Sequence, residues 1–95
     1  MTTASSATAL EIGVEISLYP LTADYIPPIQ DFIDRLNVAG KFKVITNSMS
    51  TQVFGAYEDV FGALQREIRA TFEQQAKADQ KAIFVMKVLG PLAAA

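Results

Sequence analysis

The stretch EIGVEISLYP, at residues 11–20, carries an apolar side chain at every second position. The apolar positions are Ile12, Val14, Ile16 and Leu18. In an extended chain these four point to one side, and Gly13, Glu15, Ser17 and Tyr19 point to the other. This period of two predicts a β-strand with one buried face. Pro20 ends the strand, because proline has no N–H group to donate to a neighbouring strand.

A helix is predicted after this strand. Asp24 can cap it, and Pro27 and Pro28 are tolerated only in a first turn, where backbone N–H groups have no helical partner. Asn37 and Gly40 are expected to end this helix, because both residue types are common at helix C-termini. An apolar stripe with spacings of three and four follows the prolines: Ile29, Phe32, Ile33 and Leu36. Other side chains of this helix are expected to form a solvated face: Gln30, Asp31, Asp34 and Arg35.

The second half of the chain predicts a hairpin, a longer helix and a last strand. Residues 42–46 and 51–55 read as two strands around the polar turn at 47–50. A helix from about Tyr57 to Gln75 follows, and residues 81–89 form the last strand. The stripe of that helix is Val60, Phe61, Leu64, Ile68 and Phe72.

The resulting order, β-α-β-β-α-β, predicts an α+β fold of ferredoxin-like type. Two right-handed crossovers give an antiparallel sheet of order 4-1-3-2 with both helices on one face. We expect residues 11–90 to form this single ligand-binding domain, with a flexible leader at 1–10 and a flexible tail at 91–95.

Composition excludes several classes of function. The chain has 95 residues, 51% of them hydrophobic, and a net charge of −2 with no basic cluster, so neither nucleic-acid binding nor membrane insertion is expected. The leader has no positive charge before an apolar segment, and therefore does not read as a secretion signal. Cysteine and histidine are absent, which removes disulfides, common zinc sites and the usual general base. A cytoplasmic protein without cofactor or catalytic residues is expected.

The sheet face without helices is expected to be too apolar to stay bare. In the last strand the charged Lys87 is expected on the uncovered face, and the alternation of the strand then places Ile83, Val85 and Leu89 on the same face. Strand 42–46 and the turn after it are expected to add Lys43, Ile45 and Asn47 to this face. Strand 51–55 can show this face either Thr51 with Val53 or Gln52 with Phe54. Large exposed apolar patches are rare on soluble monomers. Two explanations are compatible: packing of sheets in a homo-oligomer, a dimer or tetramer, or a ligand pocket.

Two local features are candidates for ligand binding. The segment at residues 46–52 is dense in neutral hydrogen-bonding groups, which serve either the turn itself or an uncharged heteroaromatic ligand. Glu15 lies in mid-strand, where it is either paired with Lys43 or Lys87 or contacts a ligand. In the second case its carboxylate accepts a hydrogen bond from an amino group or balances the charge of a cation. Tyr19 either packs or stacks on a planar ring. The candidate ligand-binding residues are Glu15, Ser17, Tyr19, Asn47, Ser48, Met49, Ser50, Thr51 and Gln52.

Four segments in this order resemble the YkoF-like family of thiamine- and hydroxymethylpyrimidine-binding proteins. They are ISLYPL (16–21), YIPPI (25–29), TNSMSTQVFG (46–55) and KAIFVMK (81–87). The resemblance implies non-catalytic binding of thiamine or its hydroxymethylpyrimidine moiety, linked to uptake or salvage of thiamine precursors. It also implies that two such domains pair, in this case as separate subunits that associate through their sheets.

Two alternatives remain open at this point. One is an oligomeric ferredoxin-like regulator that binds another small metabolite or ion. The other is a small ferredoxin-like enzyme, which would need a proton-transfer group in its cleft. The absence of histidine weighs against the enzyme, because histidine is the commonest general base.

Overall fold

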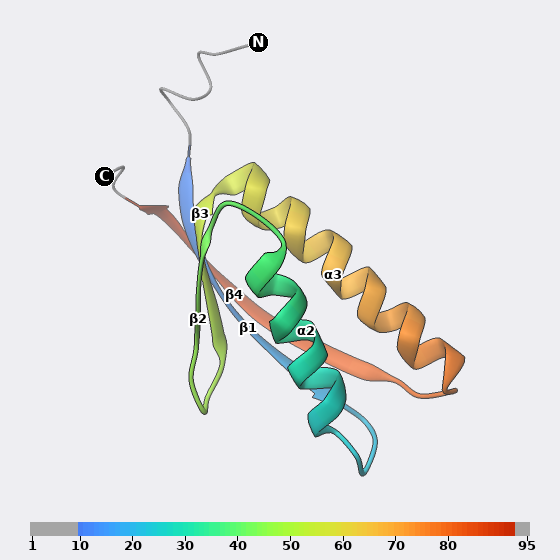
Figure 1. The fold of residues 1–95 in the computed structure, drawn as a ribbon. Helices are drawn as coiled ribbons and strands as arrows, with labels where there is room; N and C mark the ends of the chain where they lie inside the picture. Colours follow the sequence, from blue (N-terminus) through green and yellow to red (C-terminus); the bar gives the residue numbers. More distant parts are fainter. Residues whose placement is uncertain (1–9, 93–95) are drawn as a thin grey trace.

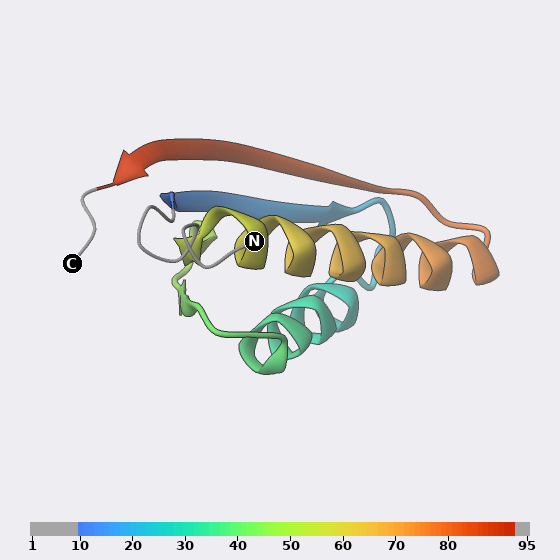
Figure 2. The same ribbon diagram turned by 90° about the horizontal axis from the view of Figure 1, so that it is seen from above.

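The computed structural model describes residues 10–92 and has two layers, a four-stranded antiparallel sheet and two helices on one of its faces (Figures 1 and 2). The elements in chain order are β1 Glu11–Pro20, α2 Ile26–Val38, β2 Lys43–Thr46, β3 Thr51–Ala56, α3 Tyr57–Lys77 and β4 Ala82–Leu92. The strand order is β2-β3-β1-β4. This confirms the predicted ferredoxin-like fold, since 4-1-3-2 is the same order read from the other edge. Residues 1–9 of the predicted leader and 93–95 of the predicted tail lie outside the described residues.

The alternation in β1 separates the two faces of the sheet as predicted. Ile12, Val14 and Ile16 are 1–3% exposed and pack under the helices, whereas Tyr19 on the opposite face is 53% exposed. Side chains from α2, β3 and α3 complete the core: Phe32, Leu36, Val53, Val60 and Leu64. Burial of these apolar side chains is the main favourable contribution to folding.

The orientation of β3, left open by the sequence, follows from its register. Val53 lies opposite Val14 of β1 and Val44 of β2, so this row faces the helices. Gln52 and Phe54 therefore face the open side of the sheet. The ring of Phe54 lies on Gly13, where a Cβ atom would come within 2.8 Å of Phe54 Cε1. Glycine at position 13 thus lets the aromatic ring lie close to the backbone of β1.

Several predicted boundaries differ from the structure. Asp24 does not cap α2, since the N-cap residue is Tyr25, without a side-chain hydrogen bond, and the prolines occupy the first turn. That helix ends at Val38, before Gly40. Strand β4 does not stop at residue 89, because Leu92 still pairs with Glu11, beyond a register shift in β1. The edge of the sheet therefore continues past Gly90 and Pro91.

The solvated face predicted for α2 is wrong at Arg35. Its guanidinium donates to Asp31 Oδ2 at 2.9 Å, to Glu67 and to Thr71 Oγ1 at 2.7 Å. The last two residues belong to α3, and only 22% of the Arg35 side chain is exposed. Arg35 thus ties the two helices together where they lie side by side (Figure 1). Helix packing turns a position that looks solvated in one helix into a contact between two.

The stripe predicted for α3 is displaced in its second half. Thr71 and Gln75 are buried there, and Phe72 is 44% exposed.

None of the helices within residues 10–92 combines the length and hydropathy needed to cross a membrane.

Candidate ligand-binding site

Strand β1 is longer than its neighbour β3. The last pair between them is Ile16 with Thr51, whereas Ser17 to Pro20 continue to pair with β4 on the other side. Beyond Ile16 the peptide groups that point toward the hairpin have no strand partner among residues 10–92. Unpaired backbone N–H and C=O groups require another partner when water is excluded. This free edge is a ready source of hydrogen bonds for a ligand.

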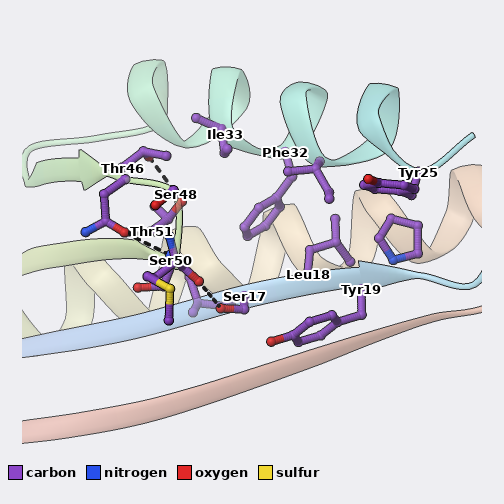
Figure 3. Close-up of a pocket in the computed structure, with 15 residues that line it drawn as sticks. Ser17, Leu18, Tyr19, Tyr25, Phe32, Ile33, Thr46, Ser48, Ser50 and Thr51 are labelled. Carbon is purple, nitrogen blue, oxygen red and sulfur yellow. Dashed lines mark hydrogen bonds between the residues drawn. The ribbon is translucent and has the colours of Figure 1, made fainter.

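A cavity of about 340 Å³ lies beside this free edge, between β1, the start of α2 and the β2–β3 hairpin (Figure 3). It is lined by residues 16–20 of β1, residues 46–51 of the hairpin, and Tyr25, Ile29, Phe32 and Ile33. None of these residues is Asp, Glu, Lys or Arg. The cavity therefore suits an uncharged ligand, with apolar walls and neutral polar groups at one end.

Some polar groups of the β2–β3 hairpin form hydrogen bonds within the turn itself. Asn47 Oδ1 accepts hydrogen bonds from the backbone N–H of Met49 at 2.8 Å and of Ser50 at 3.1 Å. The hydroxyls of Thr46 and Thr51 are 3.1 Å apart. These contacts agree with the interpretation of the segment as turn chemistry. The hydroxyl of Ser48 has no partner among the described residues, and is free to bind a ligand.

A second, smaller hollow of about 200 Å³ lies on the open face of the sheet, next to the cavity. Glu15 lies in this hollow, where its Oε2 accepts from Ser50 Oγ at 2.9 Å and its Oε1 is 3.4 Å from Lys87 Nζ. Ser17 Oγ donates to the carbonyl oxygen of Met49 in a long contact of 3.4 Å. The cavity and the hollow share four residues: Ser17, Tyr19, Met49 and Ser50.

The structure places most of the predicted site residues around the cavity, but not Glu15 and Gln52. Ser17, Tyr19 and residues 47–51 line it. Glu15 lies on the open face, and Gln52 lies beside it across the β1–β3 pair. Figure 3 shows Leu18 and Tyr19 on opposite sides of β1, with Leu18 toward α2 and Tyr19 away from it. Apart from Gln52, which lines neither, the predicted set is therefore divided between the cavity and the hollow on the open face.

Sequence reasoning missed the helix side of the cavity. Leu18, Phe32 and Ile33 read only as core residues, because their spacing is that of a buried stripe. Tyr25 carries a signal that could have been used, since an aromatic residue two positions before a proline pair lies at the start of a helix. In the structure Tyr25 lies there, at the end of the cavity away from the hairpin (Figure 3).

Within residues 10–92 no group of three or more acidic side chains is placed to hold a metal ion.

Comparison with known proteins places the chain in a family. Residues 11–88 match the sequence profile of the YKOF-related family. The chain belongs to this family. Comparison of the YKOF-related chain with curated protein sequences gives no match.

Solved structures share the fold of this YKOF-related chain at low sequence identity. A proposed thiamine biosynthesis/salvage protein from Thermotoga maritima is 21% identical, with a TM-score of 0.70 over 82% of this chain and 81% of that one. A hypothetical protein from Methanocaldococcus jannascii is 18% identical, with a TM-score of 0.71 over 90% of this chain and 84% of that one. A Streptococcus pneumoniae protein is 16% identical, with a TM-score of 0.73 over 85% of this chain and 87% of that one.

Proposed function

We propose that this protein binds hydroxymethylpyrimidine, or the pyrimidine end of thiamine, in the cavity between α2 and the β2–β3 hairpin. The binding is non-catalytic and serves the uptake or salvage of thiamine precursors. The observation that carries the proposal is the uncharged cavity beside the free edge of β1. Membership of the YKOF-related family supports it, as does the thiamine-related description of the Thermotoga maritima protein.

The chemistry of the cavity matches an aminopyrimidine. The ring nitrogens of such a ligand accept hydrogen bonds and its amino group donates them. The free edge of β1 offers both N–H and C=O groups, and Ser48 adds a hydroxyl. Phe32, Ile33 and Leu18 supply an apolar wall for the flat ring. A phosphate in the cavity would find no cation among the lining residues, and in the neighbouring hollow the Glu15 carboxylate would repel it and already occupies Lys87. Phosphorylated forms are therefore expected to bind more weakly.

The thiazolium end of thiamine would lie toward the hollow on the open face. Glu15 is the acidic residue of that hollow, and it shares the hollow with Tyr19. A carboxylate and an aromatic ring both favour a cation. Lys87 Nζ already lies 3.4 Å from Glu15 Oε1. On binding, the thiazolium ring would therefore replace the Lys87 ammonium group beside this carboxylate.

Calorimetric titration with hydroxymethylpyrimidine, thiamine and thiamine diphosphate tests the proposed function. We expect saturable binding of the first two, with the ligand recovered chemically unchanged, and weaker binding of the diphosphate. Failure of both unphosphorylated ligands to bind would reject the proposal. Recovery of a converted product would instead favour an enzyme.

Glu15→Gln is expected to weaken thiamine binding by about fivefold, which corresponds to roughly 1 kcal/mol for a partly exposed ion pair. Binding of hydroxymethylpyrimidine should be nearly unchanged, because that ligand has no cationic ring. Calorimetry with both ligands on both proteins measures the difference. Equal losses for the two ligands would reject the role of Glu15 as a counter-charge.

We also propose that the open face of the sheet packs against a second copy. This face exposes Ile45, Ile83, Val85 and Leu89 at 39–63%. Ile45 lies on edge strand β2 and the other three lie on the opposite edge strand β4. Exposed apolar residues at both edges of one sheet face are typical of a contact surface.

Ile45→Asp is expected to dissociate this sheet-to-sheet contact, because it places a charge in an apolar interface. Val38→Asp is the matched control, since Val38 on α2 is 85% exposed and far from this face. Light scattering coupled to size-exclusion chromatography measures the molar mass of both variants. The same mass for Ile45→Asp and wild type would argue against the contact.

A further inference from the structure

The tip of the β2–β3 hairpin, residues 47–50, forms one wall of the cavity without a backbone link to β1. The pairing of β1 with β3 stops at Ile16 and Thr51. Among residues 10–92 no backbone hydrogen bond joins the hairpin tip to another element. Burial does not hold it either, since residues 47–49 are exposed, Met49 at 82%. Side chains therefore determine where this wall lies.

The hairpin tip has a defined shape of its own. Asn47 donates its backbone N–H to the carbonyl oxygen of Ser50 at 3.1 Å, and its side-chain oxygen accepts from the backbone N–H groups of Met49 and Ser50. Asparagine bonds of this kind hold the shape of a short turn. The hairpin tip is therefore expected to move as one unit about Thr46 and Thr51, the last pair of the two strands.

Two side-chain hydrogen bonds attach this unit to β1. Ser50 Oγ donates to Glu15 Oε2 at 2.9 Å. Ser17 Oγ reaches the carbonyl oxygen of Met49 only at 3.4 Å (Figure 3). The first bond is the stronger one, because it is shorter and its acceptor is charged. Since Ser50 lines both the cavity and the hollow, a carboxylate on the open face holds a residue of the cavity wall.

Lys87 adds little to this attachment. Its ammonium group lies 3.4 Å from Glu15 Oε1, the carboxylate oxygen that Ser50 does not bind, and its side chain is 83% exposed. Exposed ion pairs of this kind contribute little to stability. The attachment of the hairpin tip therefore needs an acceptor oxygen at position 15, and does not need the ion pair.

We infer that Glu15, acting through Ser50, is a positioning residue that holds the hairpin tip in place as the wall of the cavity. The inference rests on the proposed function for its ligand. A wall that is already in place binds a ligand more tightly than one that must first be ordered. This role differs from that of a counter-charge to the thiazolium ring, because it serves hydroxymethylpyrimidine as well as thiamine.

Glu15→Ala is expected to weaken binding of hydroxymethylpyrimidine by about fivefold, the scale of one lost hydrogen bond. Glu15→Gln keeps an acceptor oxygen for Ser50, and should stay within about twofold of the wild-type affinity. Lys43→Ala is the matched control, since Lys43 is a charged, exposed residue of the same hairpin that does not line the cavity. Calorimetry measures the affinities, and cooperative thermal unfolding shows that each variant is folded.

Wild-type affinity in Glu15→Ala would overturn the inference and leave the proposed function standing. Equal losses in Glu15→Ala and Glu15→Gln would also overturn it, since the charge and not the acceptor oxygen would then matter.

A double-mutant cycle tests whether Glu15 acts through Ser50. Ser50→Ala removes the same hydrogen bond from its other end. The double variant Glu15→Ala/Ser50→Ala is therefore expected to bind hydroxymethylpyrimidine no more weakly than Ser50→Ala alone. Losses that multiply in the double variant would mean that the two residues act independently, and would overturn the inference.

Nuclear spin relaxation of the ligand-free, ¹⁵N-labelled protein tests the positioning without any ligand. The backbone amides of residues 48–50 are expected to have lower order parameters in Glu15→Ala than in the wild-type protein or in Glu15→Gln. Unchanged order parameters in Glu15→Ala would contradict the inference. This measurement stands even if hydroxymethylpyrimidine does not bind the wild-type protein, a result that would reject the proposed function alone.

Discussion

Leu64→Ala is expected to lower the free energy of unfolding by about 2–5 kcal/mol. Leu64 is 1% exposed and belongs to the core cluster between α3 and the sheet. Truncation removes buried apolar surface and leaves a cavity that the surrounding side chains fill only partly. Urea unfolding followed by circular dichroism measures the change as a lower midpoint with an unchanged slope.

Leu21→Ala is the matched control for this prediction. Leu21 follows β1 and is 56% exposed, so the same truncation should change the free energy of unfolding by no more than about 0.5 kcal/mol. Similar losses for the two variants would mean that Leu64 is not the core position that the structure describes.

Ile33→Trp is expected to weaken binding of hydroxymethylpyrimidine by at least about tenfold, a loss of roughly 1.4 kcal/mol or more. Ile33 is half-buried and lines the cavity from α2. An indole at this position would occupy space that the ligand ring needs in a cavity of about 340 Å³. Calorimetry measures the loss, and cooperative thermal unfolding shows that the variant is folded.

Val38→Trp lies on the same helix but outside the cavity, and should bind the ligand as the wild-type protein does. Full affinity in Ile33→Trp would contradict the location of the site. Loss of affinity in both variants would also contradict it, since the effect would then not depend on the cavity.

The fold was predictable because its main signals are local. The period of two in residues 11–20 sets which face of β1 is buried, and the helical stripes set the inner faces of α2 and α3. The errors occur where tertiary contacts decide. Arg35 reads as solvated within α2 alone, yet Glu67 and Thr71 of α3 bind it. Phe72 reads as core, yet it is half-exposed because the inner side of α3 is shifted to Thr71 and Gln75.

The candidate site was predictable only in part. Residues 47–51 were identified by their dense polarity, and Ser17 and Tyr19 by their place on β1. The cavity itself depends on β3 beginning opposite Ile16 and on α2 lying over the gap, and neither follows from local spacing. Glu15 was identified for its unusual position within a strand, and its observed partners are Lys87 and Ser50. Both interpretations of Glu15, as half of an ion pair and as a ligand contact, rested on its position within a strand. The structure shows the ion pair with Lys87.

An NMR titration of ¹⁵N-labelled protein with hydroxymethylpyrimidine tests the central claim most directly. Binding in the cavity predicts saturable shifts of the backbone amides of Ser17–Tyr19 and Ser48–Thr51, with those of α2 near Ile33. Amides of the open face around Lys87 should shift much less. Shifts centred on Lys87 and Leu89, or no shifts at millimolar ligand, would contradict the claim that this cavity holds the pyrimidine.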